Sequence, residues 1–344
     1  MMSDNLPDWI KGGGPDADVV ISTRARLARS LADYPFPSRA SGEDLSMVVS
    51  EVRRASSGLT SRFPKLKLIN VDKLSKQDKY FLLDSHLASV EQISGGNGRA
   101  VILEPSGTLS IMINEEDHVR LQTVLSGLAC RQAWELVDWA DDVLAEGLNY
   151  GHSGKYGYLT ASLSNVGTGL RVSTMMHLAG LSLKRKVNTQ LRAAYDLGVS
   201  VRGLFGEGTG WLGDMFQVSN EVTLGVSEQE IVERVRSVVQ YLLAQERLAR
   251  KELLNEERSR LLDIARRSLK TLKSAMSVKP QEAVTLMSPI RLAAALGLVE
   301  NCTGALMNEL LIGMQAGAGD DGGVSIERAA LLRKKLTDVD ILPG

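Results

Sequence analysis

The stretch Gly157-Tyr158-Leu159-Thr160-Ala161-Ser162-Leu163-Ser164-Asn165-Val166-Gly167-Thr168-Gly169-Leu170-Arg171 decides how the rest of the chain is interpreted. It begins with a β-prone run, passes through a polar turn with a glycine on each side of Thr168, and enters a run from Leu170 to Leu178 that we expect to be helical. A strand, a glycine-rich turn and a helix start direct backbone N–H groups to one point, which favours an anion such as phosphate. Arg171 adds a planar charged fork. A plain strand-to-helix connection has the same pattern, so both interpretations stay open.

The composition is that of an ordinary globular protein. The 344 residues are 44% hydrophobic and 24% charged, and the length favours two domains. The net charge of −1, with alternating signs, gives no reason to expect nucleic acid. No apolar run approaches the ~20 residues of a membrane helix, and the N-terminus has no signal-peptide pattern. Cys130 and Cys302 are far apart and form no metal-spaced pair. We therefore expect no membrane and a reduced, cytoplasmic location.

Strand and helix patterns alternate from Val19 to about residue 226. We expect helices over 43–64, 75–90, 119–145 and 178–197, and strands over 65–71, 100–103, 108–113, 200–205 and 216–224. From Ser227, where Ser227-Glu228-Gln229-Glu230 forms a capping-box pattern, the chain reads as almost wholly helical. The expected division is an N-terminal arm over 1–18, a domain over 19–250 and a helical C-terminal domain over 251–344.

Five arginines occupy expected strand ends or turns: Arg24, Arg26, Arg120, Arg171 and Arg202. Arg24 and Arg26 alternate, so on a strand they share one face, where two guanidinium groups repel each other unless an anion or an acid lies between them. A solvated edge strand is the alternative. Acids follow nearby, at Glu116 in an acidic turn and at Glu207 in a glycine-rich loop. Arginines in excess suit a nucleoside triphosphate, and the acids suit a cationic acceptor.

Two common ways of binding ATP are excluded by pattern. The chain has no G-x-x-x-x-G-K-[ST] motif, which excludes a P-loop enzyme. It also has no H-R-D or D-F-G set, which excludes a eukaryotic-type protein kinase.

Four segments in order resemble the catalytic domain of the phosphagen (guanidino) kinase family, and in particular its bacterial protein arginine kinase branch. They are Ser22–Arg26, Asn114–Arg120, Asn165–Arg171 and Arg202–Glu207. The resemblance covers about residues 19–250 closely and continues more loosely to the end. It implies an α+β fold in which an antiparallel sheet flanked by helices is followed by the helical C-terminal domain.

The resemblance also implies an activity, ATP-dependent phosphorylation of arginine side chains in proteins, a mark for degradation. ATP and Mg²⁺ would be the cofactors, with Mg²⁺ held mainly by the nucleotide, since no Asp cluster has metal spacing. The implied nucleotide-binding residues are Ser22, Thr23, Arg24, Ala25, Arg26, His86, Arg120, Arg171, Val172, Ser173, Thr174, Met175, Arg202, Gly203, Leu204, Phe205, Gly206 and Glu207. The implied catalytic residues are Glu116 and Glu207, which would orient the acceptor guanidinium and take its proton, and Ser162 beside them.

The implied partners are proteins with exposed arginines. Family analogy adds a zinc-binding activator, a Clp-type unfoldase and a homodimer. Creatine and arginine kinases carry a gating helical domain of on the order of a hundred residues before the catalytic one, whereas the catalytic pattern here starts at Val19. A site without that gate admits a guanidinium attached to a protein, which favours protein arginine over a free guanidino compound.

Three segments depart from the family pattern. The motif Thr-x-Cys-Pro-Thr-Asn is replaced by Thr160–Asn165, so Ser162 stands for a thiol that can ionise, and a serine hydroxyl stays neutral. Gly208-Thr209-Gly210 lacks an acid that the family carries. Only the second half of the branch's phosphoarginine motif Arg-Asp-x-x-Arg-Ala is matched by Val324–Ala329. These changes predict a slower enzyme and keep two alternatives open: a catalytically weakened nucleotide-binding adaptor, and a kinase of a small guanidino compound.

Overall fold

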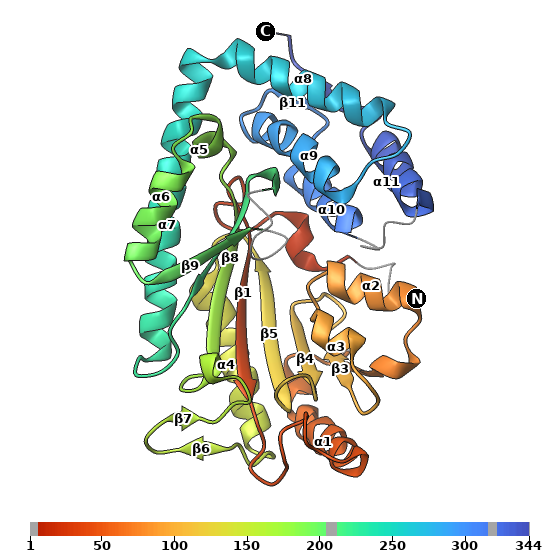
Figure 1. The fold of residues 1–344 in the computed structure, drawn as a ribbon, viewed down its shortest axis with the longest axis vertical. Helices are drawn as coiled ribbons and strands as arrows, with labels where there is room; N and C mark the ends of the chain where they lie inside the picture. The colour runs from red at the N-terminus through yellow and green to blue at the C-terminus, as the bar shows by residue number, and fades with distance from the viewer. Residues whose placement is uncertain (1–5, 204–211, 316–321, 344) are drawn as a thin grey trace.

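The computed structural model describes residues 6–203, 212–315 and 322–343. Its centre is an eight-stranded antiparallel sheet with the order β2-β3-β4-β5-β1-β8-β10-β9 (Figure 1). The strands are β1 Val20–Arg29, β2 Lys67–Asn70, β3 Ala100–Leu103, β4 Leu109–Ile113, β5 Val119–Ser126, β8 Leu170–His177, β9 Val199–Gly203 and β10 Met215–Asn220. Two small ribbons stand apart from this sheet, β6 His152–Ser153 with β7 Gly157–Tyr158, and β11 Val299–Glu300 with β12 Asp340–Ile341.

Helices surround the sheet and make up most of the C-terminal region. The α-helices are α1 Gly42–Ala55, α2 Lys76–Asp84, α3 Val90–Ser94, α4 Cys130–Ala145, α5 Ala179–Leu183, α6 Val187–Asp196, α7 Glu228–Glu256, α8 Arg258–Ser274, α9 Pro280–Ala295, α10 Gly304–Gln315 and α11 Gly322–Lys335. The short 3-10 turns are η1 Asp8–Lys11, η2 Ser56–Ser61, η3 Val71–Lys73, η4 Leu163–Asn165 and η5 Leu212–Asp214. The expected α+β class with a helical C-terminal region is confirmed.

One face of the sheet packs against α4 and α7 (Figure 1). Alternate residues of the central strand, such as Ala25 and Leu27, are fully buried there with Val137 of α4 and Val235 of α7. Because side chains alternate along a strand, the residues between them must point to the opposite face. That opposite face is where Arg24 and Arg26 of β1 lie.

A second hydrophobic core forms where α8 to α11 meet one end of the sheet. Trp9 and Ile10 of η1 belong to this core, and both are buried. Asn308 of α10 donates a hydrogen bond from Nδ2 to the Ile10 carbonyl oxygen at 3.1 Å. The segment expected as an arm thus connects the sheet to the helical region.

Two expected helices are strands in whole or in part. The run after the glycine turn, Leu170–His177, is strand β8, because it pairs with β1 on one side and β10 on the other. The expected helix 119–145 begins with strand β5, and α4 starts only at Cys130. In the first half of each strand, 170–173 and 119–122, polar and apolar residues alternate with the period of two that a half-buried strand requires.

Several local patterns are confirmed. The hairpin β3–β4 pairs as its alternation indicates. The capping box at the start of α7 is formed, since the Ser227 side chain accepts from the Glu230 N–H and the Glu230 carboxylate accepts from the Ser227 N–H. The helix expected over 75–90 is interrupted, because α2 ends at Asp84 and His86 adopts a left-handed conformation with φ of 59°.

Candidate active site

The five predicted arginines point to one face of the sheet. Arg26 lies directly opposite Arg171 of β8, and Arg120 of β5 lies opposite Ala28. Arg202 of β9 joins the same face through Gln217 of β10, its partner in the register. Because directly opposed residues in antiparallel strands share a face, the register alone brings together side chains from four strands. We call this set, Arg24, Arg26, Arg120, Arg171 and Arg202, the arginine face.

Positive charge on this face is only partly neutralised. Burial and the charges of Arg120 and Arg171 lower the pKa of Arg24 to about 10. Burial and the same kind of repulsion lower the pKa of Arg26 well below its usual value. Among the described residues, Arg26 Nε is buried without a hydrogen-bond partner. Buried donors that lack an acceptor are costly, so the arrangement favours a bound anion with several oxygens.

The candidate anion site differs from the one that the glycine turn predicts from the sequence. No helix starts at Arg171, so a helix N-terminus does not supply the N–H groups, and arginine side chains take their place. The glycines let backbones approach instead. A Cβ on Gly167, whose φ is 113°, would lie 2.2 Å from the Thr223 carbonyl oxygen. A side chain at this position would therefore separate the turn from the segment after β10.

A cavity of about 190 Å³ opens beside the arginine face. It is lined by Ser22, Arg24, His86, Val124, Ser173, Met175 and Gln217, most of which were predicted to bind nucleotide. The side chains of Thr23, Ala25, Val172 and Thr174 were predicted as well, but they are fully buried on the other face of the sheet. The prediction took continuous runs of residues and therefore included side chains on both faces of each strand. Only alternate residues reach the cavity.

His86 is fixed in this cavity by two residues that the sequence did not single out. The Trp9 indole stacks on its imidazole at a centroid distance of 5.8 Å and an interplanar angle of 33°. Gln122 of β5 donates from Nε2 to the His86 carbonyl oxygen at 2.5 Å. Burial, and then the charge of Arg24, lower the pKa of His86 to about 4, so the ring is neutral at neutral pH.

The acidic turn before β5 contains three acids with three different environments. Glu115 is buried and accepts from Arg120 Nη1 at 2.6 Å, and this pairing outweighs burial and lowers the pKa of Glu115. Glu116 is exposed, and partial desolvation together with the neighbouring Asp117 raises its pKa. Of the three, the predicted Glu116 is the one whose carboxylate is open to a substrate.

Asp117 connects this turn to the loop that carries Ser162. Its Oδ1 accepts from Ser30 Oγ at 2.6 Å and from the Ala161 N–H at 2.7 Å. Glu116 precedes Asp117 and Ser162 follows Ala161, so the hydrogen bond between Asp117 and Ala161 joins the two segments that carry these predicted residues. The Ser162 hydroxyl contacts the Ser164 hydroxyl at 2.9 Å. Asp117 was missed because its partners lie 87 and 44 residues away in sequence.

The glycine-rich loop with Glu207 lies only partly within the described residues. Arg202 and Gly203 end strand β9, whereas Leu204, Phe205, Gly206 and Glu207 fall outside the described ranges. Past the loop, Asp214 of η5 accepts from Ser288 of α9 at 2.5 Å, and the Ser288 hydroxyl contacts His177 Nε2 at 2.9 Å. The described segment after the loop is therefore fastened to the helical region.

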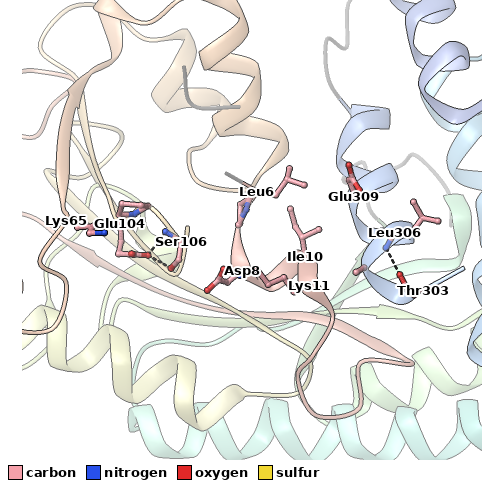
Figure 2. A pocket seen from close by; sticks show the side chains of 13 residues that line it. Leu6, Asp8, Ile10, Lys11, Lys65, Glu104, Ser106, Thr303, Leu306 and Glu309 are labelled. Carbon is pink, nitrogen blue, oxygen red and sulfur yellow. Dashed lines mark hydrogen bonds and ion pairs between the residues drawn. The ribbon is translucent and has the colours of Figure 1, made fainter. Parts of the chain in front are cut away.

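A larger cavity, of about 750 Å³, lies away from the arginine face between the β3–β4 turn, η1 and α10 (Figure 2). Its charged side chains are largely satisfied locally. Lys11 pairs with Asp8 at 2.6 Å, and Glu104 accepts from the Ser106 N–H at 2.8 Å. No predicted site residue within the described ranges lines it.

Two further properties bear on cofactors and location. Within residues 6–203, 212–315 and 322–343, no three His, Cys, Asp or Glu residues gather as metal ligands would. In the same part of the chain no helix is both long enough and apolar enough to cross a membrane.

Comparison with known families shows which protein family the chain belongs to. The model of the ATP:guanido phosphotransferase C-terminal catalytic domain matches residues 47–249, more than half of the chain. The chain therefore belongs to the ATP:guanido phosphotransferase family. The model of the Protein-arginine kinase McsB C-terminal domain matches residues 258–341. The resemblance that the four sequence segments carry is thereby confirmed.

Relatives of similar length share most of the chain. A protein named Protein-arginine kinase from Halothermothrix orenii is 39% identical over 91% of this chain and 89% of its own length. One of the same name from Moorella thermoacetica is 42% identical over 89% of this chain and 88% of its own. Among solved structures, a lombricine kinase is 26% identical, with a TM-score of 0.61 over 71% of this chain and 72% of its own. A duplicated taurocyamine kinase from Schistosoma mansoni, at 23% identity and the same TM-score, shows the fold alone.

Proposed function

We propose that the chain transfers the γ-phosphoryl group of ATP to arginine side chains of proteins. The observation that carries this proposal is the arginine face, because five guanidinium groups from four strands share one face of the sheet. The exposed Glu116 precedes β5, the strand that carries Arg120. The relatives named Protein-arginine kinase, which match nearly the whole chain, support the same acceptor.

The donor half of the reaction relies on positioning and charge. Phosphoryl transfer has a loose transition state in which negative charge spreads over the phosphate oxygens. Arg24 and Arg26 carry charge whose burial already makes it costly without an anion. Mg²⁺ bound to the phosphates would supply additional neutralisation. The cavity beside Arg24, lined by the neutral His86, accommodates the remainder of the nucleotide.

The acceptor half needs a base, since a guanidinium has a pKa above ~12 and is a poor nucleophile while protonated. Glu116 accepts a proton from the attacking guanidinium nitrogen as the N–P bond forms and the bond between the γ-phosphorus and the bridging oxygen breaks, so that ADP leaves. Glu207 keeps its predicted role as the second acid. Ser162 offers a hydrogen bond to the guanidinium but no charge.

The remaining expectations stay predictions. These are the zinc-binding activator, the Clp-type unfoldase, the homodimer, the cytoplasmic location and the domain boundaries at about 18 and 250. We propose the second boundary near the end of α7, because α7 contributes both to the core under the sheet and, through Leu253, to the core of the helical region.

The decisive experiment is mass spectrometry, under neutral conditions, of an unfolded protein incubated with the chain and ATP-Mg²⁺. Phosphoarginine is the expected product, and Arg26→Ala should reduce it by ~10²-fold or more, because a shielded contact between charged groups is lost. An exposed arginine outside the arginine face, Arg39, supplies the matched control Arg39→Ala. ATP binding without any phosphoarginine would favour the weakened adaptor, and turnover of free guanidino compounds alone would favour the third interpretation.

A further inference from the structure

Five large apolar side chains stand exposed on three neighbouring segments: the β6–β7 ribbon, the loop with Ser162 and the segment after β10. They are Tyr156, Leu159, Leu163, Val222 and Leu224, and we call them the apolar rim. Leu163 is the most exposed of the large apolar residues described, at 89%. Isolated exposed apolar residues are common, whereas a group gathered on adjacent segments indicates a contact surface.

Hydrogen bonds connect the three segments that carry the rim. Thr223 donates from Oγ1 to the carbonyl oxygens of Ser164 at 3.0 Å and of Val166 at 2.8 Å, which ties the segment after β10 to the Ser162 loop. The Tyr158 N–H donates to the Gly167 carbonyl oxygen at 2.8 Å, which ties the ribbon to the same loop. The backbones of the three segments that carry the rim are therefore held together.

The buried side chain of Arg29 contacts both the ribbon and the end of the Ser162 loop. The Arg29 guanidinium lies 3.6 Å from the centre of the Tyr158 ring and pairs with Asp141 of α4 at 2.7 Å. The Arg29 side chain also donates to the Thr168 carbonyl oxygen at 2.8 Å. The rim is thus fixed to the core of the sheet domain. It lies beyond the end of the sheet opposite to α8–α11 (Figure 1), so these helices do not cover it.

The rim is continuous with the candidate acceptor site. Leu163 lies between Ser162 and Ser164, and the preceding Ala161 N–H is held by Asp117, next to Glu116. A target arginine that reaches Glu116 from solvent is attached to the main chain of its own polypeptide. That main chain passes over the loop around Ser162, which carries Leu163 and is tied to the other two segments of the rim.

We propose that the apolar rim binds the apolar side chains that flank the target arginine in an extended or unfolded polypeptide. The inference rests on the proposed function and adds a selectivity to it. Polypeptides with apolar residues beside the arginine are expected to be better substrates than those with serine and glycine there. Because folded proteins bury their apolar residues, the rim selects non-native chains.

The test compares two fluorescent peptides that differ only in whether leucine and phenylalanine, or serine and glycine, flank a single arginine. Binding to the full chain is measured by anisotropy, and phosphorylation of the same peptides by neutral mass spectrometry. Leu163→Ser should weaken binding of the apolar-flanked peptide by about tenfold, as loss of one well-buried leucine contact does, and should leave the serine-glycine peptide unchanged. Leu224→Ser provides a second variant at the other side of the rim.

The matched control is Met276→Ser, which removes an apolar side chain that is 76% exposed between α8 and α9 of the helical region. It should change neither peptide, and nucleotide affinity should stay the same in all three variants. Equal binding of both peptides to the wild type, or equal weakening of both by Leu163→Ser, would overturn the proposal. A dimer that dissociates in Leu163→Ser would also overturn it, since a second copy would then be the occupant. Selective binding without any phosphoarginine would retain the rim and reject the proposed function.

Discussion

Arg26 of β1 and Arg171 of β8 lie directly opposite each other, so two guanidinium groups share one face of adjacent strands. Like charges in this position destabilise a sheet, and burial adds to the cost. Burial and the charges of the neighbouring arginines lower the pKa of Arg26 well below its usual value. The fold therefore retains a repulsion that a polyanionic ligand would relieve.

Replacement of Arg26 by methionine should separate stability from binding. Without nucleotide, Arg26→Met should raise Tm by roughly 2 °C or more, because a repulsive buried charge is replaced by an apolar side chain of similar length. With ATP-Mg²⁺, the wild type should gain Tm and the variant should gain little. Differential scanning calorimetry checks both results, with the exposed Arg39→Met as the control. A fall in Tm without nucleotide would mean that the charge is already neutralised in the free protein.

Trp9 offers a test of how the nucleotide cavity is supported. Trp9→Ala should raise KM for ATP by about tenfold and leave kcat nearly unchanged, because it removes the ring that orients His86 and no group that contacts the phosphates. Trp9→Phe should restore much of the affinity. Trp139 packs against Phe63 on the other face of the sheet, so Trp139→Phe is a suitable control for general loss of stability. Equal loss of kcat and kcat/KM in Trp9→Ala would assign this residue a different role.

The sequence predicts the arginines better than their surroundings, for a physical reason. Arg24 and Arg26 are identified by alternation, which is local, and their shared face follows from strand geometry. The pairing of Arg26 with Arg171 depends on a register between strands far apart in the chain, which no local pattern contains. The stacking of Trp9 on His86 is long-range in the same sense.

The errors in secondary structure have a related origin. The run Leu170–His177 contains residues that suit either a helix or a strand, and the glycine turn before it favoured a helix start. Tertiary pairing on both edges decides in favour of β8. The capping box of α7 was predicted correctly, because Ser227 and Glu230 interact within one helical turn.

Asp84, at the end of α2, predicts a pH dependence of stability. Burial raises the pKa of Asp84 to about 7, although the charge of Arg328 acts in the opposite direction. Because the folded-state pKa lies above the unfolded value, the folded protein binds the extra proton between about pH 4 and 7. The cost of ionising Asp84 is therefore small near pH 4, grows through this window and is complete above pH 7.

Asp84→Asn should accordingly raise Tm by on the order of 5 °C at pH 8, and the gain should shrink towards zero near pH 4. Thermal unfolding by circular dichroism at a series of pH values provides the measurement. Asp72, an exposed acid of η3, supplies the charge-matched control Asp72→Asn. A gain that is the same at pH 4.5 and pH 8 would show that ionisation of Asp84 is not its cause.

Ser162 allows the acceptor half of the proposed reaction to be tested separately from the donor half. A thiol near cations can ionise close to neutral pH, whereas a serine hydroxyl cannot, so Ser162→Cys would place a negative charge beside the acceptor guanidinium. This charge would act at the transfer step, and the arginine face that binds nucleotide would be untouched. We expect kcat to rise by ~10-fold, about 1.4 kcal/mol in the barrier, with KM for ATP unchanged.

Ser164 supplies the matched control, since its hydroxyl lies 2.9 Å from that of Ser162 in the same loop. Ser164→Cys introduces the same thiol two residues further along the loop and should raise kcat by much less. Phosphoarginine formed over time, quantified by neutral mass spectrometry with saturating ATP, gives kcat for each form. Equal rates for wild type and Ser162→Cys would indicate that Glu116 already supplies the required charge, and Glu116→Gln would then abolish transfer in both. Inactivity of both forms with ATP binding intact would assign the chain to the nucleotide-binding adaptors.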